Sequence, residues 1–161
     1  MKVILITIST IVLFLESKAI QLHYGGKDTR IILAVKEANK ILQNQEFTNL
    51  VNQIEKFDNT QYSGKQILSE MSTIQFVEVT EFYKSHTKTT AKTQNRISIN
   101  KAKLNRSLAS ITNTLIHECI HAVDWLTNKK WDYTHRTQHV ENPPISAPYV
   151  IGSIAQKLVK R

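Results

Sequence analysis

Two histidines and a glutamate in the second half of the chain have the spacing of a zinc hydrolase site. His117 and His121 are four residues apart, so that on a helix both imidazoles lie on one face, one turn apart. This separation lets both rings bind one Zn²⁺ ion, and Glu118 then lies beside the metal. There the carboxylate can take a proton from a water molecule that the metal activates and pass it to a leaving amine. The motif predicts zinc-assisted hydrolysis of peptide bonds, with Glu118 as the general base.

The neighbouring sequence places this motif on an amphipathic helix. Residues 109–126 carry apolar side chains at helical spacing, which predicts one buried stripe: Ile111, Leu115, Cys119, Ala122, Val123 and Leu126. Cys119 is the only cysteine of the chain, so it cannot form an internal disulfide, and we expect it to pack in the core. A structural helix that carries two histidines without a metal is the alternative interpretation of the motif.

A helix of this kind supplies two ligands, whereas a catalytic zinc ion needs three protein ligands and a water molecule. The segment after the helix holds four more side chains that are able to bind zinc: Asp132, His135, His139 and Glu141. Asp124 lies three residues after His121 and is a candidate to accept a hydrogen bond from an imidazole N–H. A solvent-facing carboxylate is the alternative for Asp124.

The sequence after the motif does not follow the three well-known zincin classes. Metzincins have a glycine three residues after the second histidine and a further histidine three residues later, where this chain has Asp124 and Thr127. No methionine follows Met71, so the methionine of a Met-turn is missing. Gluzincins use a glutamate on a following helix, but Glu141 precedes two prolines, which disfavour a helix. The glycine and tyrosine residues that frame an aspzincin aspartate are missing around Asp132.

A different resemblance extends from about residue 96 to residue 155 and rests on four segments. They read Ile97–Asn100, Asn113–His121, Tyr133–His135 and Ala147–Gly152. Together they resemble a group of small bacterial HExxH proteins, in which Tyr/Phe-x-His follows the helix and Pro-Tyr-x-Ile-Gly comes later. The resemblance implies a secreted zincin-type metallopeptidase with one catalytic Zn²⁺ ion and with His135 as the third ligand. His139, Asp132 and Glu141 stay open as alternatives.

Two tyrosines and two further histidines complete the set of candidate residues. Tyr149 resembles the tyrosines that some zincins direct at the developing oxyanion, which makes it a candidate catalytic residue. Packing beneath the site is the alternative, and Tyr133 has the same two interpretations. His23 and His86 are isolated in the sequence, and we expect no role for them.

The rest of the chain predicts a single α+β domain, residues 20–161, in which helices pack on a small twisted sheet. Apolar spacing predicts helices from residue 29 to 42 and from 47 to 57, with Asp28 or Thr29 as the first N-cap, and a third helix from Ser63 to Met71. Strands are expected at residues 20–24, 73–83 and 96–100, with an exposed turn at 84–95. Residues 143–148 predict an irregular loop, and residues 152–160 a last helix. We expect a zincin-like fold in which the strand at 96–100 lines the active-site cleft.

The first residues have the three-part layout of a secretory signal peptide. Lys2 precedes an apolar run from Val3 to Leu15, and Ser17-Lys18-Ala19 supplies the small residues of a cleavage site. The run is too short to span a bilayer comfortably, and a buried strand or an uncleaved anchor is the alternative. Cleavage after Ala19 would remove two lysines and one glutamate, so that the formal charge falls from +8 to +7. We therefore expect a secreted or periplasmic protein.

The amino-acid composition indicates which kinds of partner to expect. The hydrophobic content of 41% and the charged content of 21% are typical of a globular domain. Basic residues are scattered without interleaved aromatic residues, so we expect no nucleic acid partner and, after signal cleavage, no membrane span. Peptides or proteins are the expected substrates of an assumed monomer. The alternative is a non-enzymatic, basic binding protein whose zinc is structural or absent, with His117, His121, His135 and His139 as a closed set of ligands.

Overall fold

A computed structural model describes residues 19–58, 60–87, 90–127 and 146–159. Its elements, in chain order, are β1 (Gln21–Tyr24), α1 (Thr29–Leu42), α2 (Gln45–Asn52), α3 (Gly64–Met71), β2 (Phe76–Phe82), β3 (Ala91–Thr93), β4 (Ile97–Asn100), the 3-10 turn η1 (Lys101–Lys103), α4 (Leu108–Leu126) and α5 (Ala147–Leu158). The class is α+β, as the sequence predicts.

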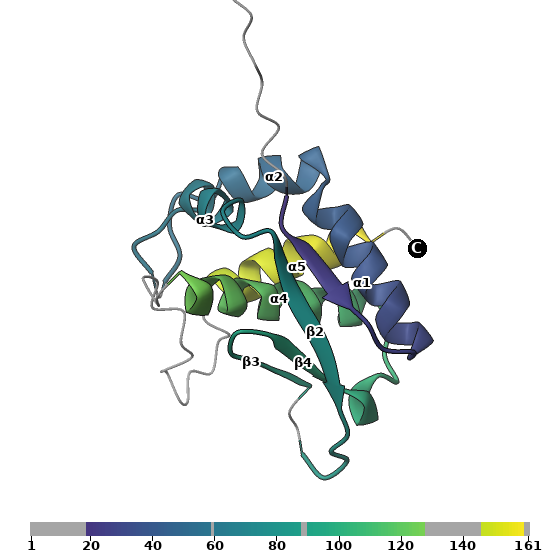
Figure 1. Ribbon diagram of the computed structural model, residues 1–161. Coiled ribbons are helices and arrows are strands. Elements are labelled where there is room, and N and C mark those ends of the chain that lie inside the picture. Colours follow the sequence, from purple (N-terminus) through teal and green to yellow (C-terminus); the bar gives the residue numbers. More distant parts are fainter. Residues whose placement is uncertain (1–18, 59, 88–89, 128–145, 160–161) are drawn as a thin grey trace, which may run out of the picture.

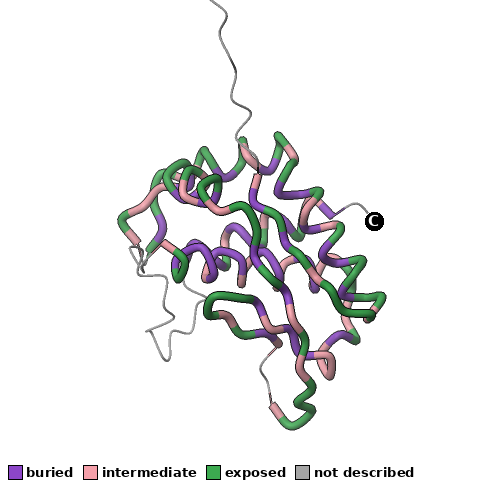
Figure 2. Tube along the Cα trace, viewed as in Figure 1, coloured by how far each residue is buried: buried purple, intermediate pink, exposed green. Residues whose placement is uncertain are grey.

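Helices cover one face of the sheet. In Figure 1, α4 and α5 lie behind the strands and pack against each other, and α1 runs alongside β1 and packs on α4. Most alternate strand positions on the covered face are buried, as Figure 2 shows along the chain. The positions on the other face, called the open face below, are exposed or only partly buried, except for the buried Asn100 at the end of β4: Gln21, His23, Phe76, Glu78, Thr80, Phe82, Lys92 and Ser98. The core of the described residues therefore lies between the sheet and the helices.

The four strands have the order β1-β2-β4-β3. β1 pairs with β2, and β2 with β4, in parallel, with Leu22 opposite Val77 and Val79 opposite Ile97. β3 pairs with β4 in the antiparallel direction, as one arm of a short hairpin. β4 therefore lies inside the sheet, and β3 forms its edge beside α4.

The two edges of the sheet differ. At the β1 edge, the N–H of Leu22 donates to Asn39 Oδ1 (2.7 Å), and Asn39 Nδ2 donates to the Leu22 carbonyl (2.9 Å). At the β3 edge, Asn100 N donates to the Thr90 carbonyl and Gln94 N donates to the Arg96 carbonyl. In an antiparallel pair the residues that bond the neighbouring strand alternate with residues that do not, so the backbone N–H and C=O groups of Ala91 and Thr93 point away from β4. Within the described ranges, only the β1 edge is covered by a side chain in this way.

α4 is built as the apolar stripe predicts. Its N-cap, Ser107, accepts a hydrogen bond from the N–H of Ser110 at 3.2 Å, which satisfies one of the free donors of the first turn. Five of the six stripe residues are buried, and Leu126, in the last position of the helix, is 41% exposed. Burial of a large side chain such as Leu115 contributes roughly 1.5–3 kcal/mol. This packing fixes which face of α4 is left for His117 and His121.

Most of the other predicted elements are confirmed. α1 begins after Asp28, whose carboxylate accepts from the N–H of Arg30. α3 begins after Ser63, and a capping box joins Ser63 to Gln66. β1, β2 and β4 lie within the ranges that the sequence predicts.

Four predictions of local structure are wrong. The second helix ends at Asn52 rather than Phe57, which is buried beyond the helix in a short bridge with Thr60. The expected turn at residues 84–95 contains β3, because pairing with β4 organises three residues whose own sequence shows no apolar alternation. The edge beside α4 is therefore β3, and not the strand at 96–100. The last helix begins at Ala147, since Pro148 fits its first turn, where no N–H is needed.

The predicted signal peptide falls on residues outside the described ranges, except for Ala19. Ala19 is partly buried, and Ile20 is 2% exposed and belongs to the core. A peptidase that cuts after Ala19 would therefore have to act before Ile20 packs, as signal peptidases do on nascent chains. Cleavage itself stays a prediction. No helix within the described ranges combines the length and apolar character needed to cross a membrane.

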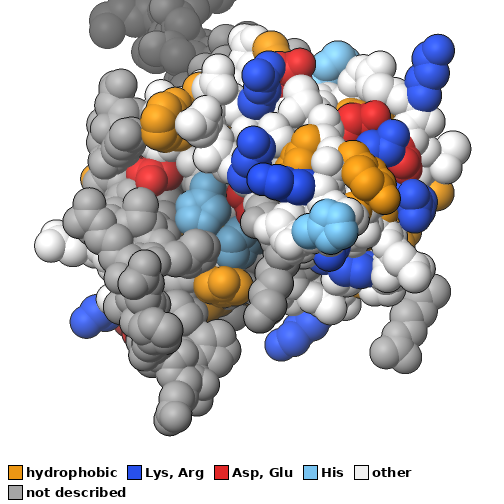
Figure 3. Space-filling view, turned by 90° about the horizontal axis from the view of Figure 1, so that it is seen from below, with side chains coloured by type: hydrophobic (Ala, Val, Ile, Leu, Met, Phe, Trp, Pro, Cys, Tyr) orange, Lys and Arg blue, Asp and Glu red, His pale blue; other side chains and the backbone are white. Residues whose placement is uncertain are grey.

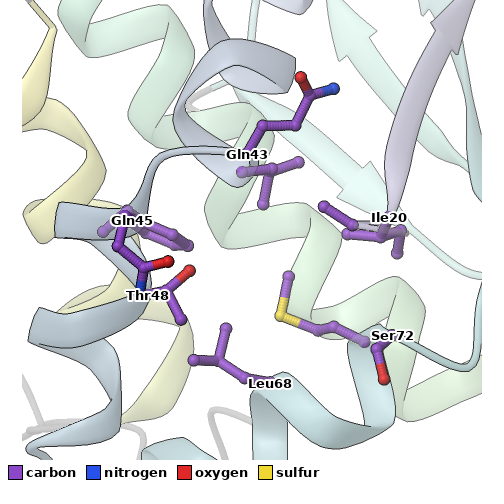
Figure 4. Close-up of a pocket in the computed structure, with 10 residues that line it drawn as sticks. Ile20, Gln43, Gln45, Thr48, Leu68 and Ser72 are labelled. Atoms are coloured by element: carbon purple, nitrogen blue, oxygen red, sulfur yellow. The ribbon is translucent and has the colours of Figure 1, made fainter. Parts of the chain in front are cut away.

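A pocket of about 300 Å³ lies beside Ile20. Figure 4 shows Ile20 on one side of this pocket and Thr48 and Leu68 on the other. Its lining consists of apolar and uncharged polar residues from the start of β1, the α1–α2 turn, α2 and α3. Its lining includes the hydroxyls of Thr48 and Ser72 but no histidine, carboxylate, lysine or cysteine that could activate them, so this pocket does not have the groups of a hydrolase site.

Candidate active site

The motif residues lie together on α4, as predicted. His117, Glu118 and His121 are all partly buried, and the ring centres of the two histidines are 5.1 Å apart, with an angle of 64° between the ring planes. Two imidazoles that bind one Zn²⁺ ion at about 2.1 Å in a tetrahedral arrangement have ring centres roughly 5 Å apart. The spacing of the pair therefore fits a shared zinc ion.

The carboxylate of Glu118 is held by the edge strand. Thr93 Oγ1 donates a hydrogen bond of 2.6 Å to Glu118 Oε2, so that β3 and α4 are joined at the motif. The other oxygen, Oε1, has no hydrogen-bond partner within the described part of the chain. Burial raises the pKa of the Glu118 carboxyl above its ordinary value, and the hydrogen bond from Thr93 lowers it in part. Glu118 thus has one oxygen fixed and one available as a proton acceptor.

α5 places Tyr149 beside the first histidine. The ring centres of Tyr149 and His117 are 4.7 Å apart in an edge-to-face arrangement with an angle of 70°. The Tyr149 side chain is 43% exposed, so the ring does not lie beneath the site as a core residue would. Tyr149 therefore contacts the motif from a partly exposed position, and both its catalytic role and the packing alternative stay predictions.

A glycine explains why α5 comes so close to the motif. A Cβ atom on Gly152 would lie 3.2 Å from the Asn113 carbonyl oxygen and 3.3 Å from His117 Cβ. Asn113 also crosses to α5, where its Nδ2 donates to Gln156 Oε1 at 2.5 Å. Gly152 therefore lets the two helices approach at the turn of α4 that carries His117, which places Tyr149 against its ring.

The other candidates of the sequence analysis have different outcomes. Asp124 is buried, with 8% exposure, so the solvent-facing alternative is wrong. Cys119 is fully buried, and burial raises the pKa of its thiol to about 12, which agrees with a core role. His23 and His86 are exposed and remain without an assigned role. The remaining candidates lie outside the described residues: Asp132, Tyr133, His135, His139 and Glu141.

The candidates for a third zinc ligand all lie outside the described residues. Among the residues that the structure describes, no group of three or more His, Cys, Asp or Glu side chains could hold a metal ion. Within the described ranges His117 and His121 lie side by side, and no third His, Cys, Asp or Glu joins them in such a group. The expected ligand His135 stays a prediction.

Thr93 is the residue that the sequence analysis missed. It lies in a Thr- and Lys-rich stretch that reads as an exposed turn, and only the pairing of β3 with β4 brings it to Glu118. Ala91, Lys92 and Thr93 show no apolar alternation that would indicate a strand, so no pattern in the sequence points to Thr93.

The surface around the motif is hollowed. Figure 3 shows histidine side chains exposed in a hollow of this face, with lysine and arginine side chains gathered beside it. A pocket of about 290 Å³ is lined by Lys92, Thr93, Gln94, Arg96 and Ser98, all from the β3–β4 hairpin. Thr93 belongs both to this pocket and to the hydrogen bond with Glu118.

Replacement of Thr93 by valine tests the hydrogen bond to Glu118. Valine keeps the branched shape and removes the donor, so the carboxylate loses its fixed position. If the chain hydrolyses peptides as the motif predicts, kcat should fall by about tenfold or more, since a hydrogen bond to a charged group is worth roughly 1.5–3 kcal/mol. Zinc content should be unchanged, and Thr93→Ser should restore most of the rate. Equal rates for Thr93→Val and the unaltered protein would show that the bond does not position Glu118.

Comparison of the chain with protein-family models, with curated proteins and with solved structures gave no match.

Proposed function

We propose that the protein is an exported zinc-dependent peptidase of the zincin type. The observation that supports the proposal is the joint placement of three groups: two imidazoles at a separation that fits one zinc ion and, next to them, a partly buried carboxylate with one oxygen that no other described residue bonds. A structural helix does not require this combination. Export is supported by the layout of residues 1–19 alone.

The chain contributes the proton transfers of the reaction. A zinc ion held by His117 and His121 would supply a Lewis acid that polarises the peptide carbonyl and acidifies water. Glu118 Oε1 is the free acceptor that takes a proton from the attacking water and then passes it to the leaving amine. Thr93 keeps the carboxylate in place through Oε2. The raised pKa of Glu118 makes it a stronger base than an exposed glutamate.

Two further residues complete the proposed site. Tyr149 lies at the rim, where its hydroxyl is a candidate donor to the oxyanion that develops on the carbonyl. His135 is proposed as the third ligand on the resemblance to the small HExxH proteins, since a catalytic zinc site needs three protein ligands and an open position.

The open edge of β3 is the proposed binding place of the substrate. A peptide in extended conformation can pair with the outward backbone groups of Ala91 and Thr93 and so add a strand to the sheet. Because the Thr93 side chain bonds Glu118, a peptide paired at this edge passes close to the catalytic carboxylate. Free peptides and exposed loops suit this mode of binding, since both can become extended.

Metal removal tests the function. The purified protein is incubated with zinc and a mixture of ten-residue peptides, and new termini are identified by mass spectrometry. We expect cleavage that stops after dialysis against a chelator and returns on addition of one equivalent of Zn²⁺, because removal of the ion takes away the Lewis acid that would polarise the carbonyl and activate the water. Cleavage that persists after chelation would point to a contaminating peptidase or another mechanism. Zinc binding without any cleavage would contradict the proposal.

A further inference from the structure

The β3–β4 hairpin places two cations beside the proposed active site. Lys92 and Arg96 are both exposed, and they line the hairpin pocket together with Thr93, Gln94 and Ser98. Lys92 Nζ lies 5.2 Å from the centre of the Phe82 ring, so its ammonium group extends over the open face of the sheet. Within the described ranges, neither Lys92 nor Arg96 belongs to any of the ion pairs. Both charges are therefore available to a ligand.

The hairpin pocket and the catalytic carboxylate share one residue. Thr93 lines the pocket and donates to Glu118 Oε2. Its side chain lies on the helix side of β3, whereas the neighbouring Lys92 side chain lies on the open face. A peptide at the β3 edge would thus pass the Glu118 carboxylate on one side and the two cations on the other.

The geometry of an added strand determines which peptide side chain meets Lys92. Directly opposite residues of paired strands point to the same face, with Cβ atoms about 4.5–5.5 Å apart. The peptide residue opposite Lys92 therefore lies on the open face, next to the hairpin pocket. The acidic residue described on that face, Glu78, belongs to β2, from which β3 is separated by β4.

We propose that Lys92 and Arg96 form a specificity subsite for a carboxylate side chain of the peptide substrate, so that cleavage is favoured within a few residues of an Asp or Glu. This inference rests on the proposed function. Opposite charges directly across a strand pair stabilise each other, and Arg96 adds a planar, multiple donor for a carboxylate. The pocket volume of about 290 Å³ has room for such a side chain.

Matched peptides test the subsite. A glutamate is moved through each position of a cleavable ten-residue peptide, and every peptide has a partner with glutamine at that position. The kcat/KM ratio of each pair is measured with the full chain loaded with zinc, and with its Lys92→Gln/Arg96→Gln double variant. We expect one position at which glutamate is preferred by about tenfold, a size typical of two exposed ion pairs, and loss of this preference in the double variant. The glutamate-to-glutamine ratio is compared within each protein, so that a general change in rate cancels, and Lys36→Gln, an exposed lysine of α1, is the control that should leave this ratio unchanged.

A second measurement separates this inference from the proposed function. Fluorescein-labelled glutamate and glutamine peptides are titrated against Glu118→Gln protein, which should bind without cleavage. Tighter binding of the glutamate peptide that disappears with Lys92→Gln/Arg96→Gln supports the subsite even if no peptide is ever cleaved. Cleavage of peptides without any preference for glutamate, or a preference that survives in the double variant, would overturn the subsite and leave the peptidase proposal intact.

Discussion

Glu118→Gln is expected to abolish peptide hydrolysis while the protein still binds one zinc ion. Glutamine has the same shape, and its amide oxygen can still accept the hydrogen bond from Thr93 Oγ1. The group that replaces Oε1 is then an NH₂, which cannot take a proton from water. Loss of a general base lowers rates by about 10²–10⁴-fold. The measurement is kcat/KM on one peptide, together with the zinc content determined by atomic emission.

A matched control separates this chemical effect from a general loss of charge. Glu78 is an exposed glutamate on the open face of β2, and Glu78→Gln should leave kcat/KM within about twofold of the original value, as surface substitutions usually do. Thermal unfolding should show that Glu118→Gln is folded, since removal of a partly buried charge imposes no new strain. Full activity in Glu118→Gln would contradict the proposed mechanism, whatever the metal content.

The elements that the sequence predicts well are those with strong local signals. α4 has an apolar stripe of helical period, and α3 has Ser63 and Gln66 at capping-box spacing. β2 has Val77 and Val79 alternating with polar or exposed residues. In each of these cases the residues that determine the element lie within it, so one sequence is enough.

The elements that were missed depend on partners that are distant in the sequence. β3 has three residues, and its strand conformation is set by pairing with β4. α5 begins five residues earlier than predicted, because Pro148 is compatible with the first turn of a helix. The sequence alone does not show whether such a proline lies in the first turn or in the loop before the helix. Phe57 continues the helical spacing of α2, but it lies beyond the helix, in a β-bridge with Thr60, and its side chain is buried there. Its burial therefore does not require a helical backbone.

The residues of the candidate site also fall into two groups, those that local spacing predicts and those that packing between elements brings to the motif. His117, Glu118 and His121 were identified from their spacing, because a helix brings residues four apart together without help from other elements. Tyr149 and Thr93 reach the motif from α5 and β3, and their contacts with His117 and Glu118 depend on packing between elements. Tyr149 was singled out by the resemblance alone, and Thr93 by no pattern at all. Local spacing thus predicts the chemistry of this site but not the residues that hold it in position.

The second large effect concerns the zinc ligands. His121→Ala should reduce zinc binding by more than about 100-fold, because replacing even an outer hydrogen-bond partner of a ligand costs about 10–100-fold. His117→Ala should do the same, since the two rings lie at the separation that a shared ion needs. The measurement is competition with a chelator of known zinc affinity at fixed pH. His23→Ala is the control, because His23 is exposed on the open face of β1.

The same titration distinguishes an open catalytic site from a closed structural one. If His135 is the third ligand of an open site, His135→Ala should weaken zinc binding as strongly as His121→Ala, and His139→Ala should have little effect. Equal losses with His135→Ala and His139→Ala would indicate four protein ligands, which leave no position for water. Such a site would favour a binding protein with structural zinc over a peptidase. Among the described residues Glu118 Oε1 has no hydrogen-bond partner, and this favours the open site, because a general base has to face the water that it deprotonates.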